Sequence, residues 1–263
     1  MASQYLEVVG RDSQIVRRRF LVLFSIFYVP TYGLQRGREP PWVLELSVSW
    51  SMLHFSQKLS TKAANKELER IDAVFNSYAN ASSGLIDPEG IERLCSDLEV
   101  DHTDVRVLML AWKMKAEKQG YFTLEEWRVG LKALRVDNVS KLKKALPELE
   151  KEVRRPSNFV DFYSYAFRYC LTEEKQKSID IDSICELLNI VLGSQYHSQV
   201  DLFTQYLKIQ NDYKVINMDQ WMGFYRFCDE ISFPDLSNYN PELAWPLILD
   251  NFVEWIREKQ SQS

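Results

Sequence analysis

The stretch SNYNPELAWPLILDNFVEWIREK, from Ser237 to Lys259, decides the fold class that the sequence predicts. Asn240 is a favourable helix cap, Pro241 suits the first helical position, and the Glu242 carboxylate favours the positive end of the helix dipole. We therefore expect a helix of about six turns that begins at Asn240. Apolar residues recur along it at the spacing of one helix face, which predicts a buried stripe: Ile248, Leu249, Phe252, Val253 and Ile256.

Packing alone does not explain two residues in this stretch. Pro246 lies inside the first two turns of the expected helix, where a proline removes a backbone hydrogen bond. Asp250 lies further along the helix, among the apolar residues of the buried stripe. Both residues therefore need a functional explanation.

The composition of the whole chain limits the classes of function. Its 263 residues suit one large domain or two small ones, and 46% apolar residues are enough for a core. The formal net charge is -5, so the positive surface of a nucleic-acid-binding protein is absent and a partner attracted by charge is expected to be basic. The cysteines lie far apart in apolar helical patterns, without metal-binding spacing. Free thiols in a reducing compartment are expected at Cys95, Cys170, Cys185 and Cys228.

Residues 1–57 differ from the rest of the chain. The apolar run FLVLFSIFYV, from Phe20 to Val29, is too short to cross a bilayer. Its basic flank imitates a secretory signal, but no small-x-small cleavage site follows, and Ala2 stands where myristoylation requires glycine. Alternating apolar residues from Trp42 to Trp50 fit a strand or an interfacial segment. We expect an atypical, poorly ordered extension here, with membrane association as the less favoured interpretation.

From about Leu59 the sequence predicts helices almost throughout. Apolar residues recur at i, i+3, i+4 and i+7, and no long alternating strand pattern follows. We expect an all-α fold of two packed helical halves, over about residues 58–155 and 156–259. Helix starts are predicted at Asp87, Thr123, Ser140, Asp180 or Asp182, Ser198 and Asn217.

Helix pairs joined by glycine-containing loops resemble EF-hands. Calcium needs oxygen ligands at loop positions one, three, five and twelve around a glycine at position six. With Gly84 at position six, the ligand positions hold small residues and a single hydroxyl; with Gly120 there, position one holds Lys115, which repels a cation. We therefore expect degenerate EF-hand-like pairs without a metal ion. A short bridge between two loops of the second half is expected at Ile181 and Ile216.

The sequence contains no pattern that is typical of a catalytic centre. It has three histidines, no nucleophile elbow and no phosphate-binding loop. The cysteines lie on apolar helical faces, where the thiolate that a transthiolation step needs is disfavoured. We expect neither a catalytic residue nor a cofactor.

Five segments resemble the helical cullin-binding domain of the defective-in-cullin-neddylation (DCN-like) family. They are IERLCSDLEVD (Ile91–Asp101), VLMLAWKMKAEKQGYFT (Val107–Thr123), FVDFY (Phe159–Tyr163), MDQW (Met218–Trp221) and, most specifically, SNYNPELAWPLILDNFVEW (Ser237–Trp255). The resemblance covers about three quarters of the chain.

This resemblance implies a scaffold-type neddylation ligase subunit without a nucleophile of its own. Such a subunit binds the C-terminal winged-helix domain of a cullin and an N-terminally acetylated conjugating enzyme that carries the ubiquitin-like modifier. A ring-type ligase subunit bound to the cullin would cooperate with it. The alternative is a non-catalytic helical adaptor, or a degenerate EF-hand protein, outside the neddylation pathway.

The resemblance assigns a cullin-binding patch to Asp219, Ala244 and Asp250. Asp219 lies at the start of one helix and Asp250 in the next, so both carboxylates can face one surface, with the small Ala244 between them. Pro246 is expected to shape the early turns so that Ala244 is open to a partner. Such a patch suits basic side chains and contributes orientation and association rate more than affinity. Without the resemblance, Asp219 would merely favour a helix N-terminus and Asp250 would be a solvated surface residue.

A second site implied by the resemblance is an apolar pocket for the acetylated methionine of the conjugating enzyme. An acetamide is neutral, whereas a free α-ammonium group would have to lose its water in such a pocket. Gln119 is the expected polar partner, and its neighbour Gly120 stands where some relatives have a reactive cysteine. Leu187 replaces a tyrosine of some relatives. The expected wall is Ile91, Val107, Leu108, Leu110, Gln119, Phe122, Tyr169 and Ile190, with Tyr169 where phenylalanine is usual.

Residues 1–57 match neither the ubiquitin-associated module nor the lipid-modified leader of many relatives. Ubiquitin binding is therefore not expected. Localisation, which this region influences in the family, is expected to be the cytoplasm, the nucleus or both.

Overall fold

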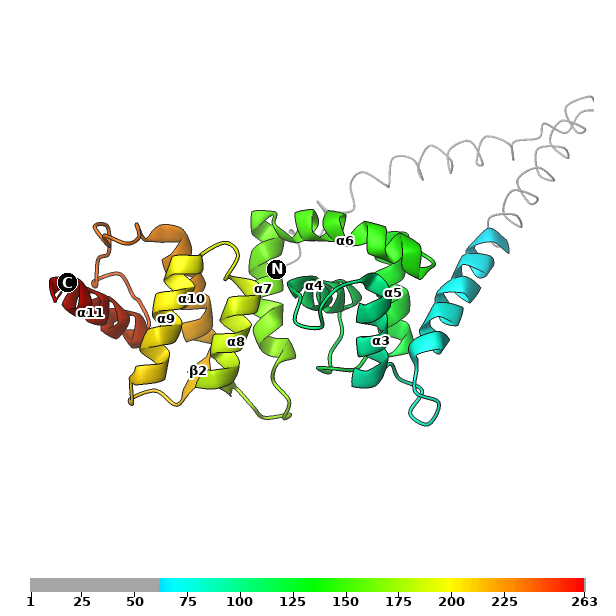
Figure 1. Ribbon diagram of the computed structural model, residues 1–263, viewed down its shortest axis with the longest axis horizontal. Coiled ribbons are helices and arrows are strands. Elements are labelled where there is room, and N and C mark those ends of the chain that lie inside the picture. The colour runs from blue at the N-terminus through cyan, green and yellow to red at the C-terminus, as the bar shows by residue number, and fades with distance from the viewer. Residues whose placement is uncertain (1–61, 263) are drawn as a thin grey trace, which may run out of the picture. The chain divides into compact units, whose positions relative to one another are not determined.

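The computed structural model describes residues 62–262 of the chain. The expectations for residues 1–57 lie outside this range. The described part is helical apart from two short paired strands and one isolated bridge, which confirms the predicted all-α fold (Figure 1). Its elements are a helix over residues 62–78, α3 (Pro88–Leu98), α4 (Val105–Met114), α5 (Leu124–Leu134), α6 (Val139–Val153), α7 (Pro156–Tyr169), β1 (Ser178–Asp180), α8 (Ile181–Val191), α9 (His197–Ile209), β2 (Val215–Asn217), α10 (Met218–Glu230) and α11 (Leu247–Ser261).

Local side-chain bonds explain most of the helix starts. Asp87, Thr123, Asp180 and Asn217 each accept a backbone N–H in the first turn of the following helix, as predicted. Thr123 forms a reciprocal capping box with Glu126.

The helix starts predicted at Ser140 and Ser198 are wrong. The cap of α6 is Asn138, whose side chain accepts the Lys141 N–H, so Ser140 lies inside the first turn. Helix α9 begins at His197, one residue before Ser198, and has no side-chain cap. A rule that looks for capping side chains cannot find such a start.

The helix predicted to begin at Asn240 starts instead at Leu247, with Pro246 in the capping position. A proline at 246 has no N–H for a helical bond, its ring clashes with the carbonyl four residues earlier, and it disfavours helical backbone in the preceding residue. Asn240 caps a turn rather than a helix, because its side chain accepts the Glu242 N–H at 2.9 Å. Residues 241–246 therefore form an irregular connection in front of α11.

Two antiparallel contacts join the loops between consecutive helices. Ile86 and Phe122 exchange backbone hydrogen bonds of 3.0 and 2.9 Å, and Ile179 on β1 pairs with Ile216 on β2. The predicted bridge residue Ile216 is therefore correct. Ile181 is wrong, because it is already the first residue of α8. The EF-hand-like character of the helix pairs stays a prediction.

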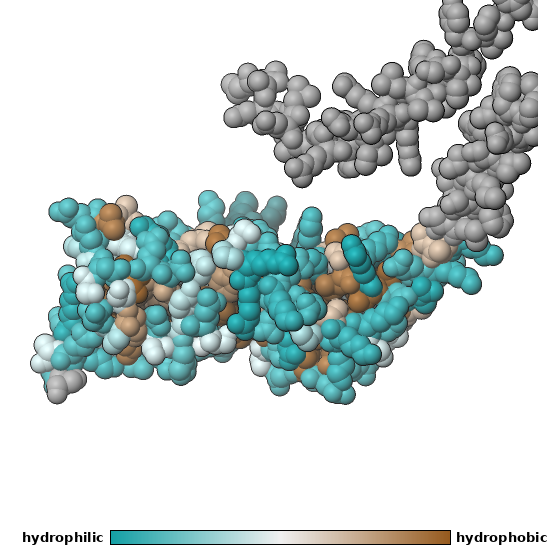
Figure 2. Space-filling model, turned by 90° about the horizontal axis from the view of Figure 1, so that it is seen from above, coloured by the Kyte–Doolittle hydropathy of each residue, from teal (hydrophilic) through white to brown (hydrophobic). Residues whose placement is uncertain are grey.

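Helix α7 lies between α3, α4 and α5 on one side and α8, α9 and α10 on the other (Figure 1). It contacts α4, α6, α8 and α10. Its aromatic residues lie in the core, as the sequence predicts: Phe159, Phe162, Tyr163 and Phe167. Hydrophilic side chains cover most of the described surface in the view of Figure 2, with small apolar areas scattered between them. No helix within residues 62–262 is long and apolar enough to cross a bilayer.

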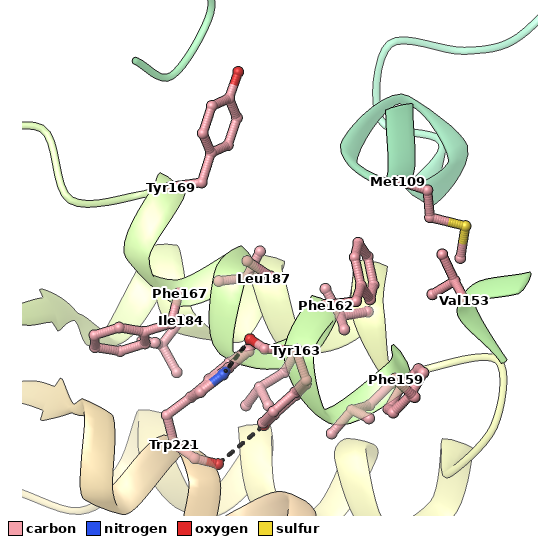
Figure 3. Close-up of a cluster of buried hydrophobic side chains, with 14 of the residues drawn as sticks. Met109, Val153, Phe159, Phe162, Tyr163, Phe167, Tyr169, Ile184, Leu187 and Trp221 are labelled. Atoms are coloured by element: carbon pink, nitrogen blue, oxygen red, sulfur yellow. Dashed lines mark hydrogen bonds between the residues drawn. The ribbon is translucent and has the colours of Figure 1, made fainter. Parts of the chain in front are cut away.

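Tyr163 on α7 and Trp221 on α10 make a reciprocal contact in this core (Figure 3). Their rings stack with centroids 4.2 Å apart and an interplanar angle of 8°. The Trp221 indole N–H donates to the Tyr163 carbonyl at 2.9 Å, and the Tyr163 hydroxyl donates to the Trp221 carbonyl at 3.1 Å. Burial raises the pKa of Tyr163 well above its ordinary value, so the hydroxyl stays a donor. This Tyr163–Trp221 pair fixes α10 against α7.

Replacing Trp221 by phenylalanine tests the importance of this pair. Trp221→Phe removes the indole donor and leaves space in the core, so the free energy of unfolding should fall by about 2 kcal/mol or more. The matched change Trp112→Phe, at a half-buried tryptophan bonded to Asp161, should cost less than about 1 kcal/mol. Urea unfolding of both variants measures the difference, and equal losses would contradict a special role for Trp221.

Candidate functional site

A cavity of about 440 Å³ lies among α3, α4, the loop before α5, the end of α7, and α8. Seven of the eight residues predicted for the apolar pocket line it: Ile91, Val107, Leu108, Gln119, Phe122, Tyr169 and Ile190. Leu110 does not line this cavity. It is only 1% exposed and faces the interior, where it borders a much smaller void together with Leu94, Leu98 and Leu146.

Of the wall that α8 and β1 contribute, sequence reasoning found only Ile190. Ser183, Glu186 and Leu187 line the cavity together with Ile190. These residues are spaced i, i+3, i+4 and i+7, so they share one face of α8. The same periodicity, started from Ile190, could have predicted them. Leu187, identified from the sequence only as a departure from relatives, is a lining residue and is almost fully buried.

The interior of the cavity is electrically neutral. Burial raises the pKa of Tyr169 to about 12 and that of Cys170 to about 11, so both are protonated near neutral pH. The Tyr169 hydroxyl accepts the Gly120 N–H at 3.3 Å, and the Tyr165 hydroxyl donates to the Ala116 carbonyl at 2.8 Å. These two bonds connect α7 to the loop that carries Gln119.

The rim of the cavity is acidic. Asp104 and Asp180 line it, and each caps the helix that follows. The Arg106 guanidinium lowers the pKa of Asp104, and the backbone N–H of Ser183 lowers that of Asp180. Both carboxylates are therefore charged near neutral pH. Glu186 also lines the cavity, at an exposed position on α8. Within the described part of the chain, no group of three His, Cys, Asp or Glu side chains is placed to hold a metal ion.

The predicted patch residues lie on two neighbouring helices and the connection between them. Asp219 is exposed in the first turn of α10, Ala244 is exposed in the connection, and Asp250 is half-buried in the first turn of α11. Gly223 lies one turn after Asp219 on the same face of α10. A side chain at 223 would meet the Pro246 ring at 2.7 Å, so only glycine allows this approach. The contact between Gly223 and Pro246 brings the starts of α10 and α11 together.

Asp250 has a fixed orientation. The Tyr239 hydroxyl donates to one of its carboxylate oxygens at 2.5 Å. Tyr239 is buried and stacks on Trp245, with ring centroids 5.6 Å apart. The next residue, Asn251, donates to the Tyr213 hydroxyl at 3.2 Å. One carboxylate oxygen of Asp250 is thus held by the protein, and the other has no bond to the described residues.

Comparison with known proteins identifies the family to which the chain belongs. A model of the cullin binding family matches residues 141–255, from α6 into α11, so this part of the chain is a cullin-binding domain. DCN1-like protein 4 of Homo sapiens is 38% identical over 205 residues, which are 78% of this chain and 68% of that protein. DCN1-like protein 5 of Bos taurus is 38% identical over 189 residues, 72% of this chain and 78% of that protein. The chain belongs to the DCN1-like family, as the sequence motifs predicted.

The close approach of Pro246 to Gly223 can be tested, because helix propensity and the structure predict opposite effects of Gly223→Ala on stability. Helix propensity alone predicts that Gly223→Ala stabilises the protein by up to about 1 kcal/mol. The structure predicts the reverse, a loss of about 1–3 kcal/mol, because the added methyl group must displace the Pro246 ring. Thermal and urea unfolding measure the sign, and stabilisation would show that Pro246 does not lie against α10.

Proposed function

We propose that this protein promotes the neddylation of cullins by holding a cullin and an N-terminally acetylated conjugating enzyme at the same time. One observation carries the proposal. In a member of the DCN1-like family, residues from α3, α4, α7, α8 and one loop converge on a single cavity at the positions expected for the acetyl-methionine pocket. The patch at Asp219, Ala244 and Asp250 lies on other helices, which leaves both partners room to bind.

The chemistry of the cavity suits an acetylated methionine. Its inner wall is largely apolar, and the tyrosine and thiol that line it are neutral. A thioether side chain adapts to an irregular apolar space, and an acetamide needs only one or two hydrogen bonds there. The Gln119 amide, which lines the cavity, can supply such a bond. An unacetylated terminus would carry an ammonium group into the same space and lose its hydration.

The chemistry of the patch suits a basic surface on the cullin. Asp219 and Asp250 present carboxylates from two helices, and the exposed Ala244 leaves space for a partner to approach. Opposite charges of this kind speed association and fix the orientation of the bound partner. In this proposal the patch orients the cullin, so that its acceptor lysine points toward the conjugating enzyme.

The protein itself contributes no nucleophile to the transfer. Burial raises the pKa of Cys95, Cys170, Cys185 and Cys228, so these four thiols are protonated and unreactive near neutral pH. The thioester belongs to the conjugating enzyme and the amine to the cullin. Holding both on one scaffold raises their effective concentration, which lowers the entropic part of the barrier. A ring-type subunit on the cullin would position the loaded enzyme further.

The proposed pocket predicts a preference for acetylation. A peptide with the N-terminal sequence of the conjugating enzyme should bind at least about tenfold more tightly when its methionine is acetylated, as isothermal titration measures. Ile190→Glu, which places a charge in the cavity, should remove this preference. Ile209→Glu, at an exposed isoleucine on α9, is the control and should leave the affinity unchanged. Equal affinities for the two peptide forms would contradict the pocket assignment.

The proposed patch predicts a charge-dependent cullin complex. Asp219→Ala combined with Asp250→Arg should weaken binding to a cullin C-terminal domain at least about tenfold, because one attraction is lost and another is reversed. Glu92→Arg, at an exposed acidic residue on α3, makes the same kind of charge reversal as Asp250→Arg and should have little effect. Surface plasmon resonance gives both affinities. Unchanged binding by the double variant would contradict the patch.

A further inference from the structure

Two exposed leucines lie beside the acidic patch, and neither the fold nor the patch explains them. Leu247 is 67% exposed, more than the other large apolar side chains that the described residues expose, and Leu243 is 46% exposed. Helix α11 already has a buried face, formed by Ile248, Leu249 and Phe252. Leu247 therefore points away from the core of its own helix.

The position of Leu247 follows from the proline before it. Because Pro246 occupies the capping position, Leu247 is the first residue of α11 and Asp250 lies three residues later. Side chains at i and i+3 are neighbours on a helix surface. Ala244 lies in the connection between Leu243 and Leu247. Leu243 thus directly precedes Ala244 in the connection, and Leu247 adjoins Asp250 on the surface of α11.

The connection that carries Leu243 is held in place from several sides. Trp245 is buried against Phe227, and its indole N–H donates to the Asn240 carbonyl at 3.1 Å. The Arg226 guanidinium lies over the same indole ring, 4.2 Å from its centroid. Pro246 lies against Gly223. The leucines are thus presented on backbone that needs little ordering on binding, which favours affinity.

We propose that Leu247, supported by Leu243, is the apolar centre of the cullin-binding surface. The cullin inserts an apolar side chain against these leucines, and basic residues around that side chain pair with Asp219 and Asp250. This inference rests on the proposed function and deepens it.

The arrangement matches the general anatomy of protein interfaces. Binding free energy concentrates in an apolar centre, while charged residues at the rim steer association. Carboxylates alone would give a fast but short-lived complex. The leucines supply the slow dissociation, and the two acids select a partner whose apolar residue is surrounded by positive charge rather than a second copy of this acidic chain.

Association and dissociation rates distinguish the contribution of Leu247 to binding from that of Asp219 and Asp250. The wild type, Leu247→Ser, Leu247→Met and Asp219→Asn/Asp250→Asn are compared on an immobilised cullin C-terminal domain at two salt concentrations. Leu247→Ser should weaken affinity at least about tenfold, mainly through faster dissociation, with the association rate and its salt dependence unchanged. The double Asn variant should mainly slow association and reduce its salt dependence.

Two control variants test whether a loss of affinity reflects the lost leucine rather than a general effect of changing an exposed apolar residue. Leu247→Met retains an apolar side chain and should stay within about threefold of the wild type. Ile209→Ser changes another exposed apolar residue, 60% exposed on α9, and should bind as the wild type does. Because Leu247 is exposed, its variants should melt at the wild-type temperature.

The possible negative results distinguish a failure of the leucine inference from a failure of the proposed function. If the wild type binds and Leu247→Ser stays within about twofold of it, the leucine inference is overturned and the proposed function stands. If the wild type does not bind a cullin, the proposed function is overturned, and this inference with it. If sedimentation shows a wild-type dimer that Leu247→Ser abolishes, a second copy rather than the cullin covers the leucines.

Discussion

The contact between Tyr163 and Trp221 relates the two candidate sites to each other. Helix α7 carries Tyr163 and ends at Tyr169, which lines the cavity, whereas α10 carries Trp221 and begins beside Asp219. Stacked rings alone could slide, but two hydrogen bonds to backbone carbonyls fix the rotation of each helix as well as its distance. One buried pair therefore sets the geometry in which a conjugating enzyme and a cullin would be held.

A single proline shapes the second site. Pro246 delays the start of α11, and the resulting connection leaves Ala244 and Leu243 exposed. Its ring lies against Gly223, which brings the first turn of α10 toward that of α11. Pro246 and Asp250, the two residues that packing did not explain, thus belong to the same surface. Pro246 leaves the apolar residues of that surface exposed, and Asp250, oriented by Tyr239, contributes a carboxylate to it.

Physical reasons decide which features the sequence could predict. Buried helix faces were predictable because burial imposes a period, and the caps at Asp87, Thr123 and Asn217 were predictable because their bonds are local. The start of α11 was predicted too early because Asn240 and Pro241 also suit a helix start, whereas Pro246 disfavours helical backbone before it and the helix begins after it. Motif positions placed Leu110 in the pocket wall, but tertiary packing turns it inward. Most of the α8 wall was missed because only Ile190 was carried over from the motifs, although the helix period places Ser183, Glu186 and Leu187 on the same face.

The central claim is that one molecule must hold both partners, and a mixing experiment tests it most directly. Single-turnover transfer of the modifier from a preloaded, acetylated conjugating enzyme to a cullin is measured with a cavity variant, Ile190→Glu, and a patch variant, Asp219→Ala/Asp250→Arg. We expect that the wild type accelerates transfer, that each variant alone does not, and that the two variants mixed together do not either. Acceleration by the mixture at wild-type level would contradict the scaffold, because separate molecules would then suffice.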